Sequence, residues 1–142
     1  MLAHALPKRE AVWWACVVAR TQVLERTRPE ITAALEAAEA WVYTPDEQTR
    51  RAAMARAQAT QFDHPGVWAA VAAFWSGGSM VAENLPAVPP AEHLTAVAVT
   101  GAVQLSAVIP DPQQAPERLR VFLAQAVDIA NGGNGLSMDG GT

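Results

Sequence analysis

The chain has 142 residues, a formal net charge of −4 and an apolar fraction of 51%, which suits one domain with a proper core and is too short for two ordinary domains. Charged residues make up only 17% and there is a single cysteine, so disordered, collagen-like and disulfide-framework classes are excluded. Abundant alanine predicts closely packed helices rather than strands.

Charge is unevenly distributed along the chain. Residues 1–56 carry eight of the ten Lys and Arg side chains, and residues 57–116 carry none. This weakly acidic balance argues against a surface that follows nucleic-acid phosphates. The most apolar stretch, 94–109, is interrupted by polar side chains and is short of a membrane span. The apolar run after Arg9 is cut off by Arg20, too early for a typical signal peptide. We expect a cytoplasmic protein that binds neither nucleic acid nor a membrane.

Proline at apparent first turns and glycine at apparent ends divide the chain into helices. The pattern predicts six of them, at residues 7–24, 29–41, 45–59, 65–75, 91–109 and 116–130. No run alternates with period two, so the predicted fold is all-α: a single compact bundle of about six helices. We expect one domain over residues 1–133 and a flexible glycine-rich tail over 134–142.

Several local features of these helices follow from the same pattern. Thr44 and Glu47 have capping-box spacing, and Asp63 or His64 would cap the helix at 65. The helix at 91–109 is apolar on nearly every side, which predicts the central and most buried position. The three arginines of the third helix are expected to face outward: Arg50, Arg51 and Arg56. Five side chains of the last helix are expected to face inward: Leu119, Phe122, Leu123, Ala126 and Val127.

One connection is unusually long for a small domain. Residues 76–90 lie between the fourth and fifth predicted helices and lack a helix or strand signal, which is typical of a functional loop or of a strap packed over the surface. Its apolar residues favour the strap, and Pro86, Pro89 and Pro90 stiffen it.

Residues with catalytic or metal-binding potential are sparse. The single cysteine, Cys16, lies in an apolar run and predicts a buried thiol. The histidines lack metal-ligand spacing, and Glu92 with His93 would act as an acid/base pair only if a pocket formed there. We expect no enzymatic activity, no metal and no cofactor. Most of the five tryptophans are expected in the core, with one or two as half-exposed partner anchors.

The segments Phe74-Trp75-Ser76-Gly77-Gly78-Ser79-Met80, Val88-Pro89-Pro90 and Asp128-Ile129-Ala130-Asn131-Gly132-Gly133 together resemble a bacterial family of unknown function associated with type VI secretion. The resemblance covers residues 11–133 and implies a small cytoplasmic accessory or adaptor protein. It supplies no catalytic residue. A shorter segment, Trp41 to Arg50, is faintly similar to alanine-rich helical immunity proteins.

The leading hypothesis is a non-enzymatic adaptor that binds another protein, a secretion component, effector or toxin. Its contact surface would comprise Trp75, Ser76, Gly77, Gly78, Ser79, Met80, Pro86, Pro89 and Pro90. One alternative is an immunity protein that neutralises a toxin. A second is a small-molecule-binding bundle with a pocket lined by Trp68, Trp75 and Met80. An alanine-rich helix face also allows a homodimer.

Overall fold

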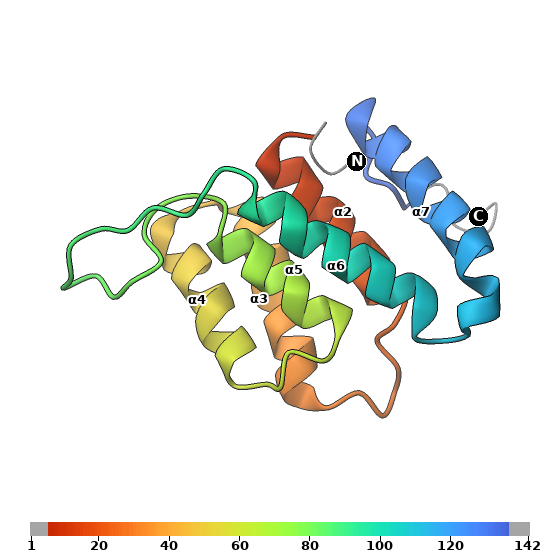
Figure 1. Cartoon of the computed structure of the whole chain (residues 1–142), viewed down its shortest axis with the longest axis horizontal. Helices are drawn as coiled ribbons and strands as arrows, with labels where there is room; N and C mark the ends of the chain where they lie inside the picture. The colour runs from red at the N-terminus through yellow and green to blue at the C-terminus, as the bar shows by residue number, and fades with distance from the viewer. Residues whose placement is uncertain (1–5, 137–142) are drawn as a thin grey trace.

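A computed structural model describes residues 6–136 of the chain (Figure 1). These residues form six α-helices and one short 3-10 helix, with no strand among them, so the all-α prediction is confirmed. The elements are α2 (Lys8–Arg20), α3 (Pro29–Tyr43), α4 (Glu47–Gln58), α5 (Pro65–Phe74), α6 (Leu94–Val108), η1 (Pro112–Gln114) and α7 (Ala115–Ala130).

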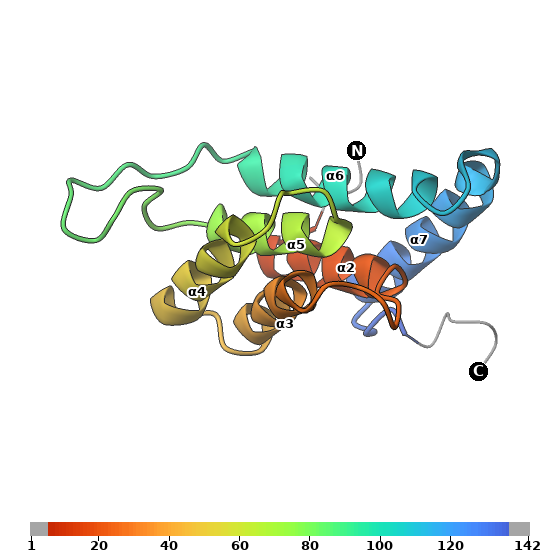
Figure 2. The same cartoon turned by 90° about the horizontal axis from the view of Figure 1, so that it is seen from below.

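Helix α5 occupies the centre of the bundle. It packs against α2, α3, α4 and α6, and Figure 2 shows it between α6 on one side and the α3–α4 pair on the other. Its small side chains permit this close packing: a Cβ on Gly66 would lie only 3.1 Å from the Cβ of Leu35 in α3. The prediction that the most buried helix is the one at 91–109 is wrong, because α6 packs on α5 from outside and leaves Val97 and Val108 exposed.

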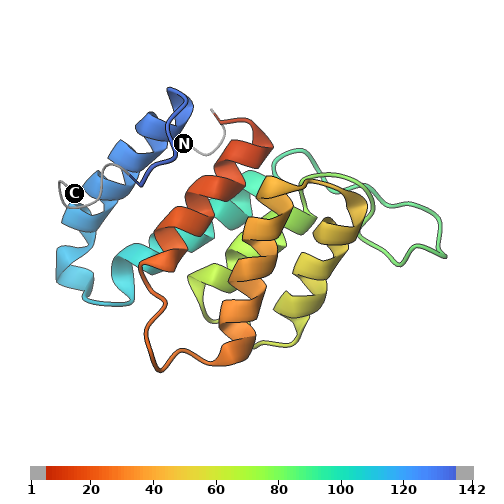
Figure 3. The same cartoon turned by 180° about the vertical axis from the view of Figure 1, so that it is seen from behind.

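Helix α7 closes the side of the bundle beside α2 and α6 (Figure 3). The buried Trp14 of α2 donates its indole N–H to the Phe122 carbonyl of α7 at 2.8 Å. Phe122 and Ala126 are buried as predicted, whereas Leu123 and Val127 are exposed. Helix α7 contacts the bundle through one narrow stripe, so only part of its apolar surface is covered.

The tryptophans divide between two environments. Trp14 and Trp41 are buried in the core, and the other three lie half-buried against it: Trp13, Trp68 and Trp75. Cys16 is fully buried, as the sequence predicts.

Two helix starts show which residues cap them. The Asp46 carboxylate accepts from the Thr49 N–H at 2.8 Å, and the Thr49 hydroxyl faces the Asp46 N–H at 3.2 Å. The capping box of α4 is therefore Asp46–Thr49, and the predicted Thr44–Glu47 pair is wrong by two residues. Glu47 instead pairs with arginines of its own helix. His64 caps α5 as predicted, since its Nδ1 accepts from the Gly66 N–H at 3.0 Å.

Residues 134 and 135, which the sequence prediction assigns to the tail, contact the bundle. The Asn134 carbonyl accepts from the Trp13 indole at 2.9 Å, and the Gly135 N–H donates to the Asp128 carboxylate at 2.9 Å. The remainder of the predicted tail lies outside the described residues.

The corrected cap gives a direct test. Asp46→Ala removes the acceptor for the Thr49 N–H and is expected to lower the free energy of unfolding by about 1 kcal/mol. Thr44→Ala, in the same turn, keeps the carbonyl to which the Thr49 hydroxyl donates. It should therefore change the free energy of unfolding by less than about 0.5 kcal/mol. Urea unfolding of both variants measures the difference, and equal effects would contradict the assignment of the cap to Asp46.

Candidate functional site

The 76–90 loop projects away from the helices instead of lying over them. Figures 1 and 2 show it extending beyond the ends of α4, α5 and α6 before it returns to α6. Met80, Leu85 and Val88 are 38%, 53% and 44% exposed, so the prediction of a strap packed across the surface is wrong. No helix lies beneath the outer part of the loop in these views, in agreement with the exposed fractions of these three side chains.

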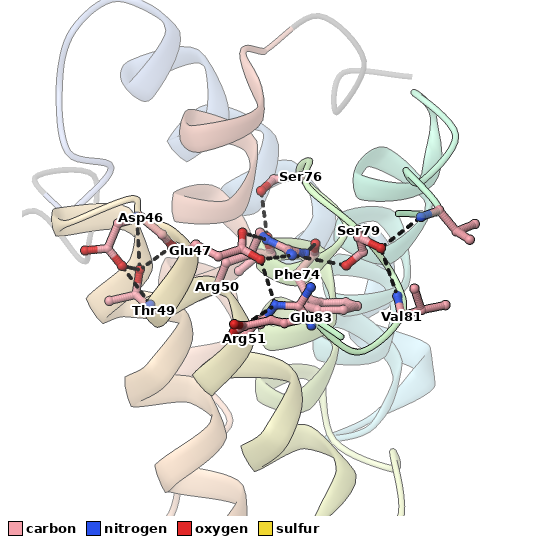
Figure 4. Close-up of polar contacts among 12 residues, drawn as sticks. Asp46, Glu47, Thr49, Arg50, Arg51, Phe74, Ser76, Ser79, Val81 and Glu83 are labelled. Carbon is pink, nitrogen blue, oxygen red and sulfur yellow. Dashed lines mark hydrogen bonds and ion pairs between the residues drawn. The ribbon is translucent and has the colours of Figure 1, made fainter. Parts of the chain in front are cut away.

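The base of the loop rests on a buried arginine (Figure 4). Arg50 is only 4% exposed, which contradicts the predicted outward orientation. Its Nη1 donates to the Phe74 carbonyl at 2.7 Å, and its Nη2 donates to the Ser79 carbonyl at 3.1 Å. The guanidinium also lies 4.5 Å above the centroid of the Phe74 ring. Arg50 therefore fixes both the last turn of α5 and the first residues of the loop.

Glu47 supplies the counter-charge for Arg50. Its two carboxylate oxygens accept from Arg50 Nε at 2.8 Å and Nη2 at 2.7 Å, a bidentate pair. Arg51 adds a bond to the same carboxylate at 2.7 Å and lies 3.6 Å from Glu83 of the loop. Hydrogen bonding from Arg50, assisted by Arg51, lowers the pKa of Glu47 from 4.5 to about 2.

Gly78 provides the space that Arg50 occupies. Its φ is +65°, and a Cβ there would lie 2.6 Å from Arg50 Nη2. A side chain would therefore be strained by the backbone and would also displace the guanidinium. Helix α5 ends at Phe74, and Gly78 lies in the turn above Arg50.

Hydrogen bonds inside the loop close its neck. The Ser79 hydroxyl accepts from the N–H groups of Val81 at 3.2 Å and Val88 at 2.9 Å. The Met80 N–H donates to the Val88 carbonyl at 2.8 Å. The two arms of the loop are thus joined near its base, and residues 82–87 form the tip beyond this neck.

Lys8 of α2 joins the two ends of the same connection. Its ammonium group donates to the Ser76 carbonyl at 3.1 Å and lies 3.4 Å from the Glu92 carboxylate. The loop is therefore attached to α2 as well as to α4.

A hollow of about 420 Å³ opens between α4 and the first arm of the loop. Its wall combines apolar and charged side chains, including Arg51, Met54, Phe74, Trp75, Met80 and Val81.

Most of the predicted site residues lie in the base and neck of the 76–90 loop. Six of them follow one another through the base and neck: Trp75, Ser76, Gly77, Gly78, Ser79 and Met80. The three prolines lie at the tip and on the returning arm: Pro86, Pro89 and Pro90. The sequence analysis missed Arg50 and Lys8, because nothing in the local pattern of either helix indicates that its side chain meets loop carbonyls distant in sequence.

The pocket predicted for a small molecule does not form as one cavity. Trp75 and Met80 line the hollow beside α4, whereas Trp68 lines a different one with Gly101, Leu105 and Leu119. Trp68 belongs to the face of α5 that turns toward α6 and α7, so the grouping of the three residues is wrong.

A separate hollow of about 380 Å³ does form beside Glu92 and His93. The Glu92 side chain is 95% exposed and pairs with Lys8, so the low-dielectric surroundings that tune a catalytic carboxylate are missing at this position. Within residues 6–136, no three His, Cys, Asp or Glu side chains are grouped to hold a metal ion.

No single helix in residues 6–136 is long and apolar enough to cross a membrane, and α6 passes that test only jointly with the segment 112–130, from which it is bent by 114°.

Fold and site together define an all-α domain that uses a buried arginine to hold a non-helical loop away from its body. Residues 1–130 match the model of a family of unknown function, DUF6931, and the chain belongs to this family. The resemblance to an uncharacterised family is thereby confirmed. Neither the curated proteins nor the solved structures gave a match.

The two adjacent glycines allow a matched test of the turn above Arg50. Gly78→Ala places a Cβ against the guanidinium in a backbone conformation that disfavours alanine, and we expect a loss of about 2 kcal/mol or more in the free energy of unfolding. Gly77→Ala meets no described atom within 4 Å and has no positive φ, so its effect should stay below about 0.5 kcal/mol. Chemical unfolding of both variants measures the contrast, and equal losses would show that Arg50 does not require the glycine.

The lowered pKa of Glu47 predicts a pH dependence. Between the unfolded value near 4.5 and the folded value of about 2, the unfolded chain binds more protons at this site. The stabilising effect of the pair is therefore complete above about pH 5 and is lost as the pH falls toward 2. Because Glu47 is half exposed, solvent screening keeps this effect small.

The comparison with Glu47→Gln isolates this effect from the other carboxylates. The difference in unfolding midpoint between the natural chain and Glu47→Gln should be largest at pH 6 and should narrow at pH 3. A difference that stays constant from pH 6 to pH 2 would mean that Glu47 titrates equally in both states.

Proposed function

We propose that this chain is a non-enzymatic protein–protein interaction module that binds its partner through the 76–90 loop and the hollow beside its base. The observation that carries the proposal is that a loop fixed at its neck by Arg50 and Ser79 presents apolar side chains to water. Large exposed apolar groups on an ordered element are typical of contact surfaces.

The energetics of association favour such an arrangement. A mobile loop loses conformational entropy when a partner orders it, whereas a loop closed by backbone hydrogen bonds and stiffened by proline loses less. Leu85 at the tip and Val88 on the returning arm could each add roughly 1–2 kcal/mol when buried by a partner. Trp75, half-buried on the wall of the hollow, is a residue type enriched among interface anchors.

The nature of the partner is proposed from the sequence resemblance alone. The loop motif and the last helix resemble a family associated with type VI secretion, which supports a secretion component or effector as the partner of a cytoplasmic adaptor. An immunity protein would use the same kind of contact with a toxin, and the identity of the bound protein distinguishes the two.

A paired capture experiment tests this function. Tagged natural chain, Leu85→Asp and Leu24→Asp are used to isolate bound proteins from native lysate, with a tag-only control and quantitative mass spectrometry. Leu24 is exposed to 55%, close to the 53% of Leu85, and belongs to the connection between α2 and α3. This connection lies far from the 76–90 loop (Figures 1 and 3).

The proposal predicts that one or two proteins are captured in equal amounts by the natural chain and by Leu24→Asp. The captured amount of the same proteins should fall at least tenfold with Leu85→Asp. Circular dichroism checks that both variants are folded. If they are and Leu85→Asp leaves binding unchanged, the placement of the contact on the loop is contradicted.

A further inference from the structure

Helix α6 carries a continuous exposed stripe on the side turned away from α5. Val97 and Val108 are 51% and 41% exposed, Gln104 is exposed, and Gly101 and Leu105 between them are half-buried. The spacing 97, 101, 104, 105 and 108 places these residues on one face of a helix. Trp68 of α5 and Leu119 of α7 flank the stripe and form with it a shallow hollow of about 640 Å³.

Among the described residues, no contact requires a glycine at position 101, in the middle of the stripe. Glycine weakens a helix interior relative to alanine, and it is normally retained for a positive φ or a close contact. Gly101 has neither, because its φ is not positive and no described atom lies within 4 Å of the Cβ it lacks. The free space above it is available to another surface.

The stripe is electrically neutral, so a second copy of the chain can approach it without like-charge repulsion. Each chain has a formal net charge of −4, so two copies repel over much of their surface, yet residues 94–110 contain no charged side chain. The exposed polar side chain of the stripe, Gln104, carries both a donor and an acceptor, so it can pair with groups on an identical face. A second copy of this chain therefore meets no like charge along this helix.

The sizes of the side chains are also self-complementary. If two α6 helices lie antiparallel with a two-fold axis between residues 102 and 103, Val97 faces the partner's Val108. Gln104 then lies over the space above the partner's Gly101, and Leu105 faces the partner's Thr100. Each larger side chain in the middle thus meets a smaller one, as an isologous contact requires.

From these observations we infer that α6 is the contact between two copies of this chain, packed antiparallel about Gly101 and Gln104. Val97 and Val108 are about 16 Å apart along the helix, so the contact buries less than about 1,200 Å² in total, the range of transient complexes. The dimer is accordingly expected to be weak. This inference is independent of the function proposed for the loop.

Sedimentation velocity from 5 µM to 1 mM tests the dimer. The natural chain should change from monomer to dimer over this range. Val97→Asp places a charge in the contact and should weaken the association at least tenfold. Val121→Asp is the control, because Val121 is 49% exposed and lies on the side of α7 opposite Leu119, so it should behave like the natural chain. A natural chain that stays monomeric at 1 mM, or an association that Val97→Asp leaves unchanged, would overturn the inference.

Cysteine pairing tests the orientation. Oxidation of a mixture of Val97→Cys and Val108→Cys chains should give a disulfide-linked dimer, whereas either variant alone should give little, since like positions lie about 16 Å apart. The native Cys16 is fully buried and supplies little background. Efficient linkage within Val97→Cys alone would indicate a parallel contact and would overturn the antiparallel arrangement.

Discussion

The buried guanidinium of Arg50 is the constraint on which the rest of the site depends. A charge removed from water is tolerated only where hydrogen bonds and a counter-charge replace its hydration. Glu47 neutralises it from one side, and the carbonyls of Phe74 and Ser79 accept from its Nη1 and Nη2. The end of α5 and the start of the loop must therefore stay where these acceptors are, which ties α4, α5 and the loop into one unit.

This requirement explains the composition of the neck. Gly78 leaves room for the guanidinium, and the carbonyl of Ser79 points down to it while the hydroxyl of the same residue accepts from the two arms above. Ser79 thus links the buried charge to the shape of the loop. These hydrogen bonds fix the neck, and the tip extends beyond the ends of α4, α5 and α6 (Figures 1 and 2).

The fold was largely predictable from the sequence, whereas the site was only partly so. Proline at helix starts and three-to-four spacing located all six helices, since both signals are local. The pattern of α6 misled because an apolar helix can be buried or can keep one face for another surface, and composition does not distinguish the two. Arg50 was misassigned because an arginine three residues after a glutamate is usually solvated. Its burial depends on carbonyls 24 and 29 residues away, which no local pattern encodes.

The two exposed apolar surfaces have a geometric relation that bears on how a dimer would work. The loop emerges at the N-terminal end of α6, and the stripe lies along the middle of the same helix (Figure 1). In an antiparallel pair the N-terminal ends of the two α6 helices point in opposite directions, so the two loops lie at opposite ends of the assembly. Such a dimer cannot close both loops around a single small partner. It would instead join two partner molecules, or two sites on an extended one, and only in the second case would the weak α6 contact raise the apparent affinity of each loop.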